Sequence, residues 1–200
     1  MHICTVNNDK QKHTTMARLK ALSPEEATGK AKELFTAIQG KLGVVPNMMR
    51  TMGNSPALLE GYLNFSSALA HGKLGSKTGE LLAMAVSEKN NCDYCLSAHT
   101  YIGEKLAHID ASALNDARSA NSTDAKTDAA LKFATVLTTK QGLVNNSDVA
   151  AVKAAGFTDG EIGEIVGHVA LNVLTNYFNN TAKTDIDFPV VNAYNSVEAL

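Results

Sequence analysis

The sequence lacks the features of disulfide-stabilised, membrane-spanning and nucleic-acid-binding proteins. It holds only three cysteines in 200 residues, and Cys4 lies far from the other two, so they do not form a disulfide framework. The formal net charge is −2, which leaves no charge excess for binding nucleic acid or an anionic membrane. No window approaches the roughly 20 apolar residues of a membrane span, because Glu164, His168 and Asn172 interrupt the best candidate, residues 162–174.

The two ends of the chain also lack strong patterns. The first nine residues have no basic segment followed by an apolar run, so we expect no signal peptide and a cytoplasmic protein. Residues 1–21 are polar and without a period, and we expect an irregular arm there. Residues 185–200 contain Pro189 and predict an irregular extension. The length of 200 residues fits a single domain.

No segment shows the alternation of a β-strand, whereas apolar residues recur at helical spacing throughout. This predicts an all-α fold with eight to ten helices. Ser23-Pro24-Glu25-Glu26 and Thr158-Asp159-Gly160-Glu161 are typical of helix starts and predict helices from residue 24 and from residue 159. We expect the others over residues 48–52, 56–70, 77–89, 92–106, 110–120, 124–140 and 147–155. Ser76 is the expected cap of the helix that carries Glu80.

The chemistry-bearing residues gather in one stretch. Cys92 and Cys95 form a C-x-x-C pair, His99 follows four residues later, and Glu80 lies one helix upstream. If a helix begins near Cys92, Cys95 and His99 share a face, with Cβ atoms roughly 5–6 Å apart. A helix N-terminus and a nearby histidine both lower a thiol pKa. A peroxide oxidises a thiolate to a sulfenic acid, which a second thiol converts to a disulfide. The spacing therefore suits a two-electron redox cycle.

Other roles of a C-x-x-C pair fit less well. A structural zinc site needs four ligands, and the nearby sequence supplies three. A c-type haem is excluded because Leu96, not histidine, follows Cys95. A thioredoxin fold needs a βαβ unit that this chain lacks. Two inert buried cysteines remain an alternative. We expect neither a metal nor an organic cofactor.

The combined spacing of Glu80, Cys92, Cys95 and His99 resembles the signature of the AhpD-type alkylhydroperoxidases, within the carboxymuconolactone decarboxylase family. The likeness extends from about residue 21 to residue 189. It implies an all-α fold, a trimeric or hexameric homo-oligomer, and reduction of a small hydroperoxide by the cysteine pair with an external thiol as reductant.

The resemblance also implies roles for the four residues. Cys95 would be the attacking thiolate, Cys92 the resolving thiol, and Glu80 with His99 a proton relay. The two cysteine roles are open to exchange, because the first cysteine attacks in most other C-x-x-C proteins. The family pattern places a second histidine where this chain has Tyr94, and a phenol is a poor base near neutral pH.

Two other functions stay open at this stage. One is a lactone decarboxylase, although members with that activity lack the cysteine pair. The other is a non-catalytic oligomer whose cysteines sense redox state. We expect His168 to be a hydrogen-bonded core or interface residue, with a pocket wall as the alternative. The row Asn172, Asn176 and Asn180 predicts a polar seam between subunits.

Overall fold

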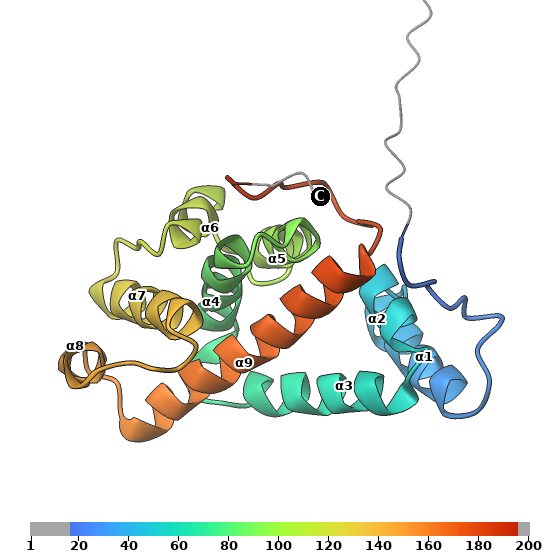
Figure 1. Cartoon of the computed structure of the whole chain (residues 1–200), viewed down its shortest axis with the longest axis horizontal. Helices are drawn as coiled ribbons and strands as arrows, with labels where there is room; N and C mark the ends of the chain where they lie inside the picture. The colour runs from blue at the N-terminus through green and yellow to red at the C-terminus, as the bar shows by residue number, and fades with distance from the viewer. Residues whose placement is uncertain (1–16, 196–200) are drawn as a thin grey trace, which may run out of the picture.

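The computed structural model describes residues 17–195, which form nine α-helices and no strand (Figure 1). The helices are α1 (Gly29–Leu42), α2 (Asn47–Met52), α3 (Pro56–Ala70), α4 (Gly75–Lys89), α5 (Asp93–Lys105), α6 (Ala111–Arg118), α7 (Ala125–Thr139), α8 (Asn146–Ala154) and α9 (Asp159–Ala182). The predicted all-α class is therefore confirmed. Between residues 17 and 195, no helix combines the length and hydrophobicity that crossing a bilayer requires.

The predicted irregular ends fall partly outside the described residues. Residues 1–16 of the arm, which include Cys4, and residues 196–200 of the extension are not described. The remaining parts, residues 17–21 and 185–195, contain no helix.

Two helix starts differ from the prediction. Ser23 and Glu26 do exchange the two capping hydrogen bonds, at 3.1 and 3.2 Å, but these enclose a single turn. Gly29 has a left-handed φ of 51°, so the regular helix begins there and not at residue 24. The N-cap of α4 is Leu74 and not Ser76, which places Glu80 in the second turn of that helix.

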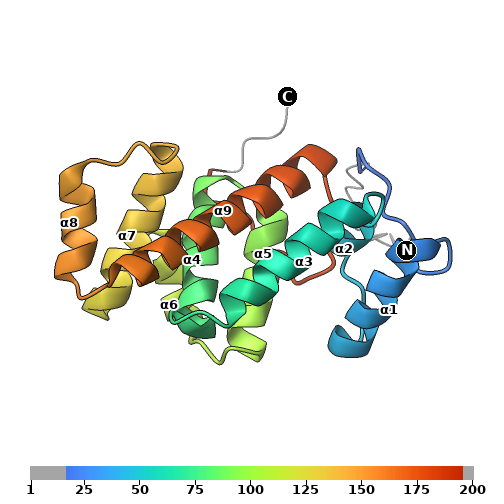
Figure 2. The same ribbon diagram turned by 90° about the horizontal axis from the view of Figure 1, so that it is seen from below.

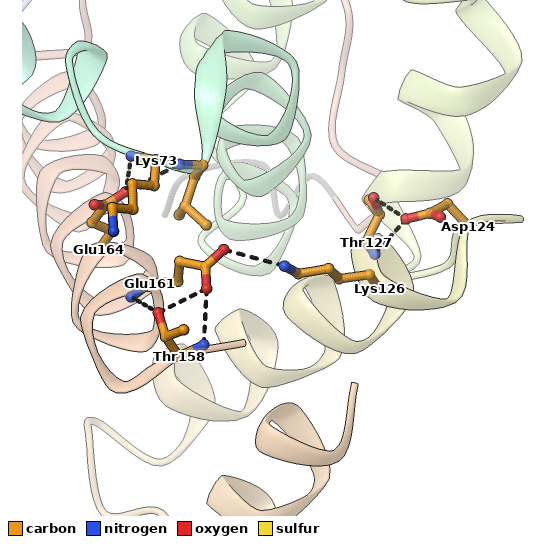
Figure 3. A network of polar contacts seen from close by, with 8 residues as sticks. Lys73, Asp124, Lys126, Thr127, Thr158, Glu161 and Glu164 are labelled. Carbon is orange, nitrogen blue, oxygen red and sulfur yellow. Dashed lines mark hydrogen bonds and ion pairs between the residues drawn. The ribbon is translucent and has the colours of Figure 1, made fainter. Parts of the chain in front are cut away.

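The start of α9 is tied to two other helices (Figure 3). The predicted capping box is present: Glu161 N–H donates to Thr158 Oγ1 at 3.2 Å, and Thr158 N–H donates to Glu161 Oε2 at 2.8 Å. Lys126 of α7 forms an ion pair with Glu161 at 3.1 Å. One turn further along, Glu164 accepts a hydrogen bond from the N–H of Lys73, just before α4, at 2.7 Å. These contacts fix α9 against α7 and the start of α4.

The core has two apolar clusters, and α9 contributes to both. Leu131 and Ile165 belong to the cluster built from α4 to α9. Phe35 belongs to the cluster of α1, α2, α3 and the start of α5, against which Phe178 packs from the end of α9. Figure 1 shows α9 running diagonally across the molecule, and Figure 2 shows it beside α3 with α4 and α5 behind. The C-x-x-C pair lies in the second cluster.

Candidate active site

The two neighbouring cysteines form the N-terminus of α5. Asn91, with a left-handed φ of 50°, turns the chain after α4, and Cys92 becomes the N-cap of α5. Cys95 N–H donates to Cys92 Sγ at 3.4 Å, and the two sulfur atoms of these free thiols lie 2.7 Å apart. Both residues are buried, with exposed fractions of 0 % and 2 %. The thiols therefore contact each other and the protein interior, not bulk solvent.

The predicted carboxylate and histidine form a direct pair across two helices. His99 Nδ1 lies 2.8 Å from Glu80 Oε2, which joins α5 to α4. Both side chains are mostly buried. A carboxylate at Nδ1 holds the proton on that nitrogen and leaves Nε2 to exchange a proton with another group. The structure thus brings Glu80 to His99, and Cys92 to Cys95, within one region.

The surroundings shift the pKa values of the two thiols in opposite directions. Burial raises the pKa of Cys95, but the hydrogen bond from Cys92, the charge of His99 and the side-chain amides of Asn179 and Asn176 outweigh it and lower this pKa to about 7. The hydrogen bond to Cys95 and burial raise the pKa of Cys92. Cys95 is therefore close to half-ionised at neutral pH, while Cys92 keeps its proton and donates it to the Cys95 sulfur.

Glu80 maintains the charge on His99. Burial lowers the pKa of His99, but the charge and hydrogen bond of Glu80 and the charge of Cys95 raise it above the usual histidine value. A protonated His99 in turn favours the Cys95 thiolate. Ionisation of the thiol and protonation of the imidazole support each other.

Asn179 contacts the Cys95 sulfur, although no sequence pattern predicts it. Its Nδ2 lies 3.3 Å from Cys95 Sγ, and the side chain is 2 % exposed. No local signal identifies this contact, because 84 positions separate the two residues.

The predicted seam of asparagines between subunits is wrong for Asn176, which is buried within the chain. Asn176 donates to Ser87 Oγ and accepts from Asn90 Nδ2, and Asn180 donates to the Asn90 carbonyl. These bonds connect α9 to α4 within one chain. Asn172 donates to the His168 carbonyl of its own helix.

Tyr94, between the two cysteines, contributes to a different part of the structure. Its hydroxyl accepts a hydrogen bond from the N–H of Met48 in α2 at 3.1 Å, and its ring packs edge-on against Phe188 at 5.8 Å. Burial raises the pKa of Tyr94. The side chain of Tyr94 joins α5 to α2 and to the C-terminal segment. The family pattern has a basic histidine at position 94.

A cavity of about 160 Å³ reaches the Glu80–His99 pair from the side of α3 and α9. Tyr62, His168 and Asn172 are among its lining residues. Burial, followed by the charges of Cys95 and Glu80, raises the pKa of Tyr62 to about 12, so its hydroxyl keeps its proton. His168 thus lines the cavity, in agreement with the alternative prediction of a pocket wall. Its Cε1 lies 3.0 Å from where a Cβ on Gly79 would stand, so this glycine allows the imidazole to approach α4.

Within residues 17–195, no three His, Cys, Asp or Glu side chains converge in a way that could hold a metal ion. The side chains that meet at the site are two thiols, an imidazole, a carboxylate and a carboxamide.

Comparison with known proteins places these residues in a wider group. Residues 56–138 match the model of the Carboxymuconolactone decarboxylase family. This region includes Glu80, Cys92, Cys95 and His99, but not α9. No curated protein matches the sequence.

Several solved structures share the fold. An alkylhydroperoxidase AhpD core, a peroxidase-related protein from Ralstonia eutropha JMP134, is 25 % identical with a TM-score of 0.75, over 86 % of this chain and 92 % of that one. A peroxidase-related protein from Silicibacter sp. TM1040 is 24 % identical with a TM-score of 0.72, over 85 % and 94 %. A cysteine-to-alanine variant of the debrominase Bmp8, in complex with 2,3,4-tribromopyrrole, is 20 % identical with a TM-score of 0.73, over 86 % and 93 %. The predicted AhpD-like fold is thus confirmed.

Proposed function

We propose that this chain is an AhpD-like oxidoreductase of the carboxymuconolactone decarboxylase family, which reduces small hydroperoxides with the Cys92–Cys95 dithiol. The geometry of the thiols carries the proposal: two buried sulfurs lie 2.7 Å apart. The Cys92 hydrogen bond and the charge of His99, which pairs with Glu80, lower the pKa of Cys95 to about 7. The peroxidase-related proteins of the same fold support an enzymatic role.

In the first step, the Cys95 thiolate attacks the terminal oxygen of the hydroperoxide. An S–O bond forms, the O–O bond breaks, and the substrate leaves as an alkoxide. His99, protonated with the help of Glu80, gives its proton to the alkoxide. Acid–base assistance of this kind contributes typically about 10²–10⁴-fold to a rate.

In the second step, the sulfur of Cys92 attacks the sulfenic acid on Cys95. The S–S bond forms and the S–O bond breaks, and the departing hydroxide takes the Cys92 thiol proton to become water. An external thiol then returns the disulfide to the dithiol. We assign the cycle to the cytoplasm, where thiol reductants are available, and to a homo-oligomer, as the family resemblance implies.

The test is peroxide consumption by pre-reduced protein with Cys4→Ser throughout, so that thiol counts report only on the pair. We expect two thiols to be lost per tert-butyl hydroperoxide consumed. Cys95→Ser should be inert, and Cys92→Ser should stop at a sulfenic acid that dimedone traps. The opposite pattern would exchange the cysteine roles. Thiols that stay reduced in excess peroxide would contradict the proposal.

A second candidate is reductive dehalogenation, supported by the debrominase of the same fold. Two thiols would replace bromine by hydrogen and leave as a disulfide with bromide and a proton. Bromide release from 2,3,4-tribromopyrrole, measured with the same variants, would favour this function. Lactone decarboxylation should survive both serine substitutions, and a pure redox sensor should form the disulfide without turnover.

A further inference from the structure

One buried side chain at the sulfur has no part in the cycle just described. Asn179 donates to Cys95 Sγ at 3.3 Å from α9. Its Oδ1 is buried and has no hydrogen-bond partner among residues 17–195. Since most buried side-chain polar atoms in proteins are paired, an unpaired carboxamide oxygen beside the reacting atom needs an explanation.

We propose that Asn179 is a further catalytic residue, whose carboxamide donates to the Cys95 thiolate and then accepts the hydroxyl of the Cys95 sulfenic acid. The second half of this inference rests on the proposed peroxide reduction. The first half, the contact with the thiolate, holds for any chemistry that starts from Cys95.

The hydrogen-bonding capacity of a carboxamide fits both states. It has two N–H donors and one oxygen acceptor on a single planar group. A thiolate can only accept hydrogen bonds, and Cys95 Sγ accepts one from the Nδ2–H of Asn179. A sulfenic acid carries an O–H donor. Because this donor is buried away from water, it needs an acceptor in the protein. Oδ1 belongs to the same carboxamide and is free to accept it.

In the cycle, Asn179 acts on the sulfenic acid oxygen of Cys95, which is gained in the first step and lost in the second. When the S–O bond forms and the O–O bond breaks, the alkoxide takes its proton from His99. The new hydroxyl on Cys95 then donates to Asn179 Oδ1. When Cys92 attacks the sulfur, the S–O bond breaks, and hydroxide leaves with the Cys92 proton as water. Asn179 thereby preserves the sulfenic acid until Cys92 reacts.

The backbone of α9 is fixed at this point. The neighbouring Asn176 donates to Ser87 of α4, and Asn180 donates to Asn90, the C-cap of α4. The carboxamide can therefore stay beside the sulfur through the cycle without a shift of the helix. Thr181 is exposed on the same helix, so Thr181→Ala is the control.

The first measurement is the pH dependence of Cys95 alkylation by iodoacetamide in Cys4→Ser protein. Asn179→Leu removes the donor, and we expect about tenfold slower alkylation at pH 6, which corresponds to about one unit of pKa. Asn179→Asp keeps the shape but places a negative charge beside the sulfur, and it should slow alkylation further. Thr181→Ala should match the parent.

The second measurement is the lifetime of the sulfenic acid in the Cys4→Ser, Cys92→Ser background, followed by dimedone trapping. Asn179→Leu should shorten this lifetime several-fold, whereas Asn179→Asp, which keeps an acceptor, should shorten it less. Parent-like alkylation and lifetime in a folded Asn179→Leu protein would overturn the inference; if that variant does not fold, parent-like alkylation by Asn179→Asp would do so. If the parent consumes no peroxide while Asn179 variants still slow alkylation, the proposed function fails and the role at the thiolate stands.

Discussion

Residues from three helices control the proton of Cys95. Cys92 and His99 come from α5 and its cap, Asn179 from α9, and Glu80 of α4 acts through His99. Burial alone would keep this thiol protonated, and the surrounding donors and charge outweigh it. The reactivity of Cys95 therefore depends on pH in a predictable way: the thiolate is lost as the pH falls through about 7.

Glu80→Gln should move this pH dependence upward. Without the carboxylate, the pKa of His99 falls, His99 loses its charge, and the pKa of Cys95 rises above about 7. We expect the midpoint of Cys95 alkylation to rise by about one unit, which lowers the rate at pH 6 about tenfold. Glu104→Gln, on the same helix as His99 but outside the cavity, should leave the midpoint unchanged. An unmoved midpoint in Glu80→Gln would rule out the relay.

Tyr94→Phe should affect stability and not the thiol. The change leaves the buried N–H of Met48 without its acceptor, and an unpaired buried donor costs about 1–3 kcal/mol. Urea unfolding should show this loss, while the alkylation midpoint of Cys95 stays at the parent value. A shift of that midpoint with unchanged stability would mean that the phenol acts on the sulfur.

At the scale of elements, the C-terminal segment holds the turn that carries the two cysteines. Ala193 N–H donates to Asp93 Oδ1 at 2.7 Å, and Val191 N–H donates to Ser97 Oγ at 2.9 Å. Arg118 donates to the Asn192 carbonyl at 2.7 Å. Together with the Tyr94–Phe188 contact, these bonds attach residues 188–193 to the first turns of α5 and to the end of α6.

The ion pair between Arg118 of α6 and Glu88 of α4 should be a main support of this segment. Its N–O distance is 2.7 Å, and the side chains are 9 % and 10 % exposed. Arg118→Ala leaves a buried carboxylate unpaired, which costs about 3–5 kcal/mol. Urea unfolding measures this cost. The exposed Lys132–Asp128 pair is the control, since Lys132→Ala should cost under about 1 kcal/mol. Equal costs for both substitutions would contradict the argument.

At the scale of the whole molecule, the site lies where the two apolar clusters meet. α4 supplies Glu80, α5 supplies the thiols and His99, and α9 supplies Asn179. α9 crosses the molecule (Figure 1), and its start is fixed by the Thr158–Glu161 capping box (Figure 3). Its end is fixed by Phe178, which packs against the second cluster.

The outer face of α9 should be covered by a second copy of this chain. Val166 and Tyr177 are 44 % and 57 % exposed beside a hollow of about 400 Å³ between α7 and α9, and the family resemblance implies a trimer or a hexamer. Sedimentation should give a mass above that of the monomer. Tyr177→Lys should lower this mass, and Leu106→Lys, at an exposed apolar residue after α5, should not. A monomeric parent would contradict this prediction.

The sequence by itself determined the all-helical fold and the placement of Cys92, Cys95 and His99 at the start of one helix, because the signals for these are local. Thr158 caps α9 as predicted, and Ser55 caps α3; each side-chain oxygen accepts a hydrogen bond from the N–H three residues later. The C-x-x-C spacing places Cys92 and Cys95 in one turn, and His99 follows one turn later on α5. A cap or a helical period involves neighbours in the chain, so no tertiary contact is needed to establish it.

The tertiary structure alone decided what surrounds the thiols. Asn179 meets Cys95 across 84 positions, Tyr94 turns towards Met48 instead of the sulfurs, and His168 enters the cavity because Gly79 leaves room for it. The left-handed Gly29 likewise delayed the start of α1 beyond its capping turn. These outcomes depend on how helices pack, and packing joins residues whose relation no local pattern records.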